Sequence, residues 1–240
     1  MATDSSIRST VRAGIAVGVA SSAYGISFGA LATASGLDVW QACVMSLLMF
    51  TGGSQFALIG VLASGGLAAG PSAIAGAALL GARNGIYGIR MKPVVAGHGF
   101  WQTFVAAWLT IDESTAVAVA QPDLRRQRVG FWTTGITIFI LWNLTTLIGA
   151  LIGDALGDIR QYGLDAAAPA AFLGLLWPRL RKLQPIAVAV GAAVVAVALT
   201  PVLPTGIPVL AAALVAVIVG LTNWLGRKDE LAKLPEGESS

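Results

Sequence analysis

Long apolar stretches dominate this sequence, and short loops that carry most of its charged residues separate them. An α-helix needs roughly 20 largely apolar residues to cross the hydrocarbon core of a bilayer. By this measure the candidate spans cover residues 12–34, 39–63, 69–89, 98–121, 130–153, 166–178, 184–200 and 205–225. The stretches at 166–178 and 184–200 are short for full crossings. An alternative is therefore that they form a helical hairpin that is partly re-entrant. The chain would then cross the membrane seven times instead of eight.

The pattern predicts an all-α integral membrane protein, a polytopic bundle of about seven or eight transmembrane helices. We expect residues 1–225 to form a single transmembrane domain and residues 226–240 to form a polar cytoplasmic tail. The first ten residues are polar and have no cleavable apolar core, so the first helix is expected to act as the insertion signal.

Composition excludes several other classes of protein. The 240 residues are 56% hydrophobic and only 11% charged, whereas soluble domains contain about 25% charged residues. The pI of about 9.4 does not indicate nucleic-acid binding, because the basic residues lie in short clusters between apolar runs. Cys43 is the only cysteine and His98 the only histidine, so we expect neither an internal disulfide, nor a metal site, nor a cofactor.

The basic clusters also predict the orientation, because loops rich in Lys and Arg stay on the cytoplasmic side. With both termini in the cytoplasm, the basic residues on the opposite side are Arg90, Lys92 and Arg160, the last in a loop that also contains Asp154, Asp158 and Asp165. The cytoplasmic loops then contain Arg8, Arg12, Arg125, Arg126, Arg128, Arg179, Arg181, Lys182, Arg227 and Lys228.

Glycines spaced by four residues indicate close helix packing. The pairs are Gly14 and Gly18, Gly25 and Gly29, and Gly149 and Gly153. Small residues at this spacing let two helix backbones approach each other in lipid, where packing replaces the hydrophobic effect.

A polar run interrupts the second span: Thr51-Gly52-Gly53-Ser54-Gln55. Two adjacent glycines disfavour a continuous helix by about 1 kcal/mol each relative to alanine. We therefore expect this span to be broken near its middle. The N-terminus of a half-helix attracts carboxylates, and unwound carbonyl groups coordinate cations or ammonium groups, so this run is a candidate substrate site. The alternative is a glycine contact between helices, with Gln55 bonded to a neighbour.

Charged residues lie deep in the third and fourth spans, and ionisable groups at membrane depth usually face a cavity or each other. Arg83 and Asn84 lie in the middle of the third span, and Asp112 and Glu113 lie well inside the fourth. Arg83 either holds a substrate or pairs with one of the two carboxylates. Since adjacent residues on a helix diverge by about 100°, one carboxylate is expected to face Arg83 and the other a substrate path. Either could carry a coupling proton.

Asn143 near the middle of the fifth span is a secondary candidate, but an asparagine there is more often bonded across a helix interface.

Ser27 lies in the pattern Gly-x-Ser-x-Gly, which is typical of hydrolases. That motif needs a strand, a turn and a histidine base, and here it lies in an apolar helix. An intramembrane hydrolase built from Ser27 or Ser54 with His98 is therefore a remote alternative.

Several motifs, taken in order along residues 11–224, resemble the AzlC family of permeases, the large subunits of branched-chain amino-acid exporters. The most specific is Met45-Ser46-Leu47-Leu48-Met49-Phe50-Thr51-Gly52-Gly53-Ser54-Gln55-Phe56. The others are Gly25–Gly29, Ala82–Asn84, Tyr87-Gly88, Thr110–Ser114, Gly163–Asp165, Ala170–Phe172 and Pro204–Gly206. In the family the third-span motif commonly ends in arginine and histidine, whereas this chain has Gly81-Ala82-Arg83-Asn84, so a histidine relay is not implied here.

The resemblance implies export of leucine, isoleucine, valine or similar amino acids from a bacterium through its inner membrane, driven by proton exchange. It also implies a small membrane partner subunit of the AzlD type. A transporter or passive channel for another small solute on the same scaffold is the alternative. A structural membrane subunit without transport activity is a further one.

Overall fold

The computed structural model describes residues 4–95, 99–156, 170, 173–174, 176–177 and 180–222. Within these ranges the chain forms helices and contains no strand, which confirms the all-α prediction. The helices are α1 (Asp4–Ser22), α2 (Tyr24–Ala34), α3 (Val39–Leu48), α4 (Gly52–Gly65), a 3₁₀ turn η1 (Leu67–Ala69), α5 (Gly70–Val95), α6 (Gly99–Trp108), α7 (Asp112–Val119), α8 (Leu124–Leu156), α10 (Leu183–Leu199) and α11 (Ile207–Thr222).

Two helical stretches are long and apolar enough to cross a membrane, Ser5–Ala34 and Leu124–Leu156. Helices α3, α10 and α11 are apolar but shorter. Many of their large side chains face outward, as expected of helices that contact lipid. These observations agree with a helical membrane protein. The number of spans stays a prediction, because most of the 166–178 stretch lies outside the described residues.

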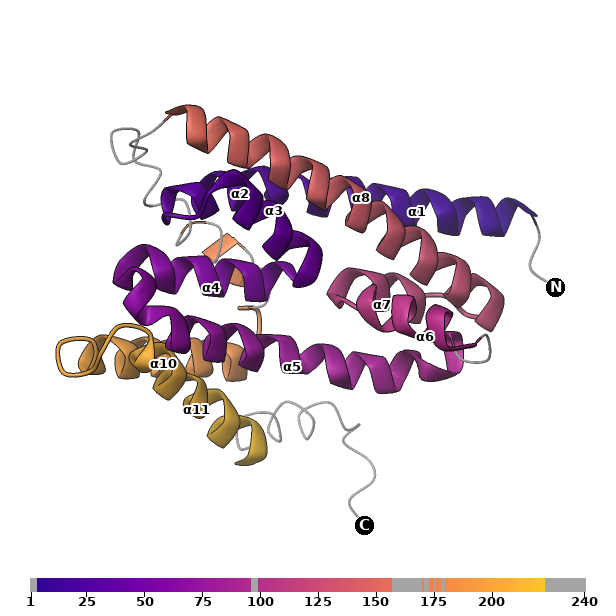
Figure 1. Ribbon diagram of the computed structural model, residues 1–240. Coiled ribbons are helices and arrows are strands. Elements are labelled where there is room, and N and C mark those ends of the chain that lie inside the picture. The colour runs from indigo at the N-terminus through magenta and orange to yellow at the C-terminus, as the bar shows by residue number, and fades with distance from the viewer. Residues whose placement is uncertain are drawn as a thin grey trace, which may run out of the picture.

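Helices α1 and α2 run side by side with α8 along much of its length, as Figure 1 shows. The glycines of the four-residue spacing lie in this contact. A side chain at Gly29 would collide with the carbonyl of Thr146 on α8, and one at Gly149 would collide with the carbonyl of Ile26. The predicted close packing through glycine is therefore confirmed.

A one-residue interruption, called the kink below, separates α1 from α2 at Ala23. The carbonyl of Ser22 accepts a hydrogen bond from the Thr145 hydroxyl of α8 at 2.7 Å. A side chain that bonds a helix carbonyl in this way interrupts the hydrogen-bond pattern of the helix. The interruption lies beside Ser21 and Tyr24, which line the cavity described below.

The second span is interrupted as predicted, between the end of α3 and the start of α4. The break occupies residues 49–51, so Gly52 and Gly53 form the first turn of α4 and are not themselves unwound. The Gln55 side chain lies on this break. Its amide nitrogen donates to the Met49 carbonyl at 2.7 Å and lies 3.4 Å from the carbonyl of Ser46.

The expectation that residues 98–121 form one continuous span is wrong, because a second break separates α6 from α7 at residues 109–111. The Ser114 hydroxyl donates to the Leu109 carbonyl at 2.6 Å and accepts the backbone N–H of Ile111 at 3.1 Å. Asp112 and Glu113 therefore lie in the first turn of a short helix. They are not inside a long one.

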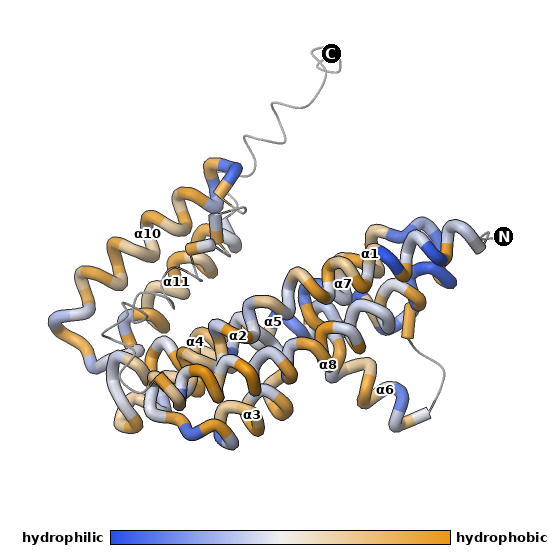
Figure 2. The backbone as a smooth tube through the Cα atoms, turned by 90° about the horizontal axis from the view of Figure 1, so that it is seen from above, coloured by the Kyte–Doolittle hydropathy of each residue, from blue (hydrophilic) through white to orange (hydrophobic). Residues whose placement is uncertain are grey.

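Helices α10 and α11 form a hairpin that extends away from the other helices in Figure 2. Their bounds agree with the predicted spans at 184–200 and 205–225. The turn between them contacts the start of α5, where the Ser72 hydroxyl donates to the Thr205 carbonyl at 2.8 Å. The predicted tail at 226–240 and His98 lie outside the described residues.

Candidate functional site

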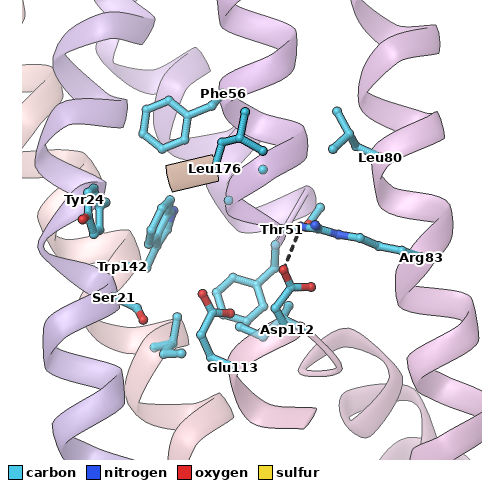
Figure 3. Close-up of a pocket in the computed structure, with 15 residues that line it drawn as sticks. Ser21, Tyr24, Thr51, Phe56, Leu80, Arg83, Asp112, Glu113, Trp142 and Leu176 are labelled. Atoms are coloured by element: carbon cyan, nitrogen blue, oxygen red, sulfur yellow. Dashed lines mark ion pairs between the residues drawn. The ribbon is translucent and has the colours of Figure 1, made fainter. Parts of the chain in front are cut away.

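A cavity of about 250 Å³ opens between the two helix breaks (Figure 3). Its walls come from the kink between α1 and α2, from both breaks, from the middle of α5 and from α8. The residues that line it are Ser21, Tyr24, Phe50, Thr51, Gly52, Gly53, Phe56, Leu80, Arg83, Ile111, Asp112, Glu113, Ile138, Trp142 and Leu176.

Two predicted residues, Gly52 and Gly53, bring the first turn of α4 to the cavity. A Cβ atom at Gly52 would lie 3.0 Å from the Cη2 atom of Trp142, and one at Gly53 would lie 3.0 Å from an Nη atom of Arg83. The missing side chains thus leave room for an indole on one side and a guanidinium on the other. The first N–H groups of a helix have no acceptor within it, so this turn presents hydrogen-bond donors and the positive end of the helix dipole.

Arg83 and Asp112 form an ion pair across the cavity, with 3.1 Å between Nη2 and Oδ2 (Figure 3). Arg83 comes from the middle of α5 and Asp112 from the first residue of α7. Their side chains are 29% and 23% exposed, so the pair lies at the wall and is reachable from the cavity. Of the two carboxylates that the sequence offered as partners for Arg83, the structure places Asp112 there. Arg83 both pairs and lines the cavity.

Glu113 points into the cavity beside the ion pair in Figure 3. Asp112 and Glu113 both line the cavity, and Asp112 pairs with Arg83. That one of the two carboxylates faces a substrate path stays a prediction. Both belong to the acidic first turn of α7, where a helix dipole favours negative charge.

The other large side chains that line the cavity are apolar. They are Phe50, Phe56, Leu80, Ile111, Ile138, Trp142 and Leu176. The Phe50 ring packs edge-on against Phe139, and the Phe56 ring packs edge-on against Trp142. Charged and large apolar side chains therefore line the same small cavity.

Other predicted site residues lie behind the lining or beside it. Ser54 and Gln55 are almost fully buried, and Gln55 accepts the indole N–H of Trp142 at 2.9 Å. Asn84 follows Arg83 on α5 and is partly buried. None of these three is among the lining residues of the described part of the chain. Their role in substrate binding stays a prediction.

The expectation that Asn143 bonds across a helix interface is wrong. Its side-chain nitrogen donates to the carbonyl of Phe139 on the same helix at 2.7 Å. Asparagine readily bonds to backbone groups near it in sequence, and this local bond takes the place of one between helices. Ser27 lies inside α2, so the strand–turn–helix context of a hydrolase motif is not present around it.

The sequence analysis proposed none of the large apolar lining residues, Trp142 among them, and it also missed Ser21 and Tyr24. One signal was available for Trp142, which lies in the middle of the 130–153 span. Tryptophan in membrane helices is enriched at the two interfaces, so an indole at mid-span is unusual. The kink at Ala23 has no comparable signal in the sequence.

Comparison with known proteins gives one family. The sequence model described as AzlC protein matches residues 16–156. No curated protein and no solved structure matches the chain significantly. The matched segment contains every residue that lines the cavity except Leu176.

Proposed function

This chain belongs to the AzlC family of membrane transport proteins, and from that membership we propose that it exports branched-chain or other hydrophobic amino acids. The proposed location is the bacterial inner membrane, with seven or eight crossings and both termini in the cytoplasm. A small AzlD-type membrane subunit is the proposed partner, and exchange with protons is the proposed driving force.

The observation that carries this proposal is the mixed chemistry of the cavity. A hydrophobic amino acid has a carboxylate, an ammonium group and an apolar side chain within a few bonds of each other. The cavity has a partly buried cation, two partly buried carboxylates and apolar lining residues at similarly short range. Its volume of about 250 Å³ is close to the lower end of the range for ligand pockets, about 300–1,000 Å³, so it suits a small solute.

In this proposal the first turn of α4 and Arg83 hold the substrate carboxylate. The Arg83 side chain lines the cavity and is 29% exposed, so a ligand can reach its guanidinium. Glu113 attracts the ammonium group, and Asp112 holds Arg83 in place when the cavity is empty. Asp112 or Glu113 carries the coupling proton, because a carboxyl group in a largely apolar space can bind and release one.

The direct test measures efflux from cells preloaded with leucine, isoleucine and valine by feeding dipeptides. The chain is expressed alone, with the small membrane subunit, and with that subunit plus Arg83→Ala. We expect export that needs both chains and is lost with Arg83→Ala. A matched control is Arg126→Ala, which removes an ion pair with Asp123 outside the cavity and is expected to leave export unchanged. Absence of export from a well-expressed complex would refute the proposed substrates.

Proton coupling has its own test, the pH dependence of efflux in Asp112→Asn and Glu113→Gln. We expect one of these variants to uncouple transport from the proton gradient while the complex still assembles. Unchanged pH dependence in both variants would remove the proton-carrier role. Flux that persists without a proton gradient and does not saturate would instead indicate a passive channel.

A further inference from the structure

We propose that Trp142, locked in place by Gln55, sets the upper size limit for the substrate side chain. This inference rests on the proposed function and deepens it, since it assigns a specificity-determining residue among the apolar lining residues. Trp142 lines the cavity, yet it is only 7% exposed, so most of its surface packs against neighbours that hold it.

Four neighbours fix the indole. Its N–H donates to the side-chain oxygen of Gln55 at 2.9 Å, and the Phe28 ring stacks on it at 6.4 Å between centroids. Phe56 meets it edge-on at 6.4 Å, and its outer edge lies against Gly52, where even one added carbon would come within 3.0 Å. An aromatic ring confined on several sides cannot change rotamer to admit a larger ligand.

Gln55 is the positioning residue in this arrangement. It is fully buried, and it joins Trp142 to the carbonyl of Met49 at the break between α3 and α4. The wall of the cavity and the start of α4 are therefore fixed to each other. Since a buried side-chain network of this kind rigidifies its surroundings, the apolar part of the cavity keeps a constant size.

The inference predicts how the preference for substrate size changes. Trp142→Phe removes one ring and enlarges the cavity, so the ratio of phenylalanine to valine efflux should rise by about tenfold, the effect expected of one or two carbon atoms in an apolar pocket. Gln55→Leu frees the indole and should raise the phenylalanine ratio like Trp142→Phe, although Trp142 itself is unchanged.

The matched control is Trp132→Phe, the same substitution on the same helix at a residue that packs against the core and does not line the cavity. It should leave the ratio unchanged. Equal changes in efflux of all substrates in Trp142→Phe would overturn the inference, since a purely structural residue has that effect.

A second measurement tests cavity size without transport. Ser21, a lining residue, is replaced by cysteine in a Cys43→Ser background, so that one thiol faces the cavity. Methyl and benzyl methanethiosulfonates are then compared for their rates of modification in purified protein. Trp142→Phe should raise the benzyl-to-methyl rate ratio by about tenfold, and Trp132→Phe should leave it unchanged.

The two measurements separate the possible failures. If the modification ratio shifts but wild-type complex exports none of the amino acids, the proposed function fails and the size limit stands as a property of the cavity. If wild-type complex exports them but Trp142→Phe shifts neither ratio, the function stands and the size limit is refuted.

Discussion

Two helix breaks border the cavity, one between α3 and α4 and the other between α6 and α7. They differ in the side chain that bonds to the backbone of the break, and in the residues that they place at the cavity. At the first break the buried amide of Gln55 donates to the Met49 carbonyl, and at the second the hydroxyl of Ser114 donates to the Leu109 carbonyl. The first presents two glycines to the cavity, and the second presents two carboxylates.

This difference shows how two similar interruptions supply complementary chemistry. The acidic turn of α7 satisfies the positive end of its own helix dipole with its own side chains. The first turn of α4 carries no acidic residue, so its N–H groups can serve an anionic ligand. Arg83 lies between the two turns, near Gly53 and paired with Asp112. The anionic and cationic parts of the proposed site therefore come from different helices.

The largest expected effect on stability comes from removing one charge of the ion pair between Arg83 and Asp112. Asp112→Ala leaves Arg83 without its partner at a partly buried site, which should destabilise the protein by about 3 kcal/mol. Chemical unfolding in detergent micelles measures this value. The double variant Arg83→Ala/Asp112→Ala should lose less than the sum of the two single variants, and strict additivity would contradict a direct coupling.

Gln55 and Ser114, the side chains that bond to the two breaks, should differ in how much each stabilises the protein. Gln55→Leu leaves the indole N–H of Trp142 without its acceptor, while the carbonyl of Met49 still accepts the backbone N–H of Thr51 at 2.8 Å, so the substitution should cost about 2 kcal/mol. Ser114→Ala removes one hydroxyl and should cost about 1.5 kcal/mol. The same unfolding assay compares them. A loss of stability in Ser114→Ala that equals or exceeds the loss in Gln55→Leu would contradict this prediction.

A smaller change in stability is expected for Gly53→Ala. Helix propensity favours alanine by about 1 kcal/mol, while the new methyl group would lie 3.0 Å from the guanidinium of Arg83 and displace it. These effects oppose each other, so stability should change by less than about 1 kcal/mol while efflux falls. Gly81→Ala, on α5 beside Ser54, is a control for glycine replacement away from the cavity. Normal efflux in Gly53→Ala would argue against ligand binding at this turn.

The smallest effect is expected outside the membrane, at Asp123. The backbone N–H of Arg126 and then its guanidinium hold the pKa of this carboxyl below its ordinary value. A lowered folded-state pKa stabilises the fold above the ordinary pKa, and this contribution is lost as the pH falls below about 4. Asp123→Asn should therefore reduce the acid sensitivity of unfolding slightly and leave efflux unchanged. A loss of efflux would disqualify the pair of Asp123 and Arg126 as a control.

Local sequence signals predicted part of the site. Two adjacent glycines predicted the first break within a few residues, because their cost in a helix is a local property. The acidic pair Asp112-Glu113 was proposed as part of the site, but it was not identified as a helix start, although acidic residues in a first turn are a usual start signal. The apolar residues on both sides of the second break made one continuous span the simpler interpretation.

The sequence by itself determined the helical fold, the family, the glycine contacts and the candidate residues Gly52, Gly53, Arg83, Asp112 and Glu113, which line the cavity. Each of these follows from composition, spacing or a local motif. Only the tertiary structure decided that Asp112 pairs with Arg83, that Gln55 holds Trp142, and that the kink at Ala23 joins the cavity. These contacts join residues far apart in the chain, and their geometry depends on how the helices cross. No local pattern records that crossing.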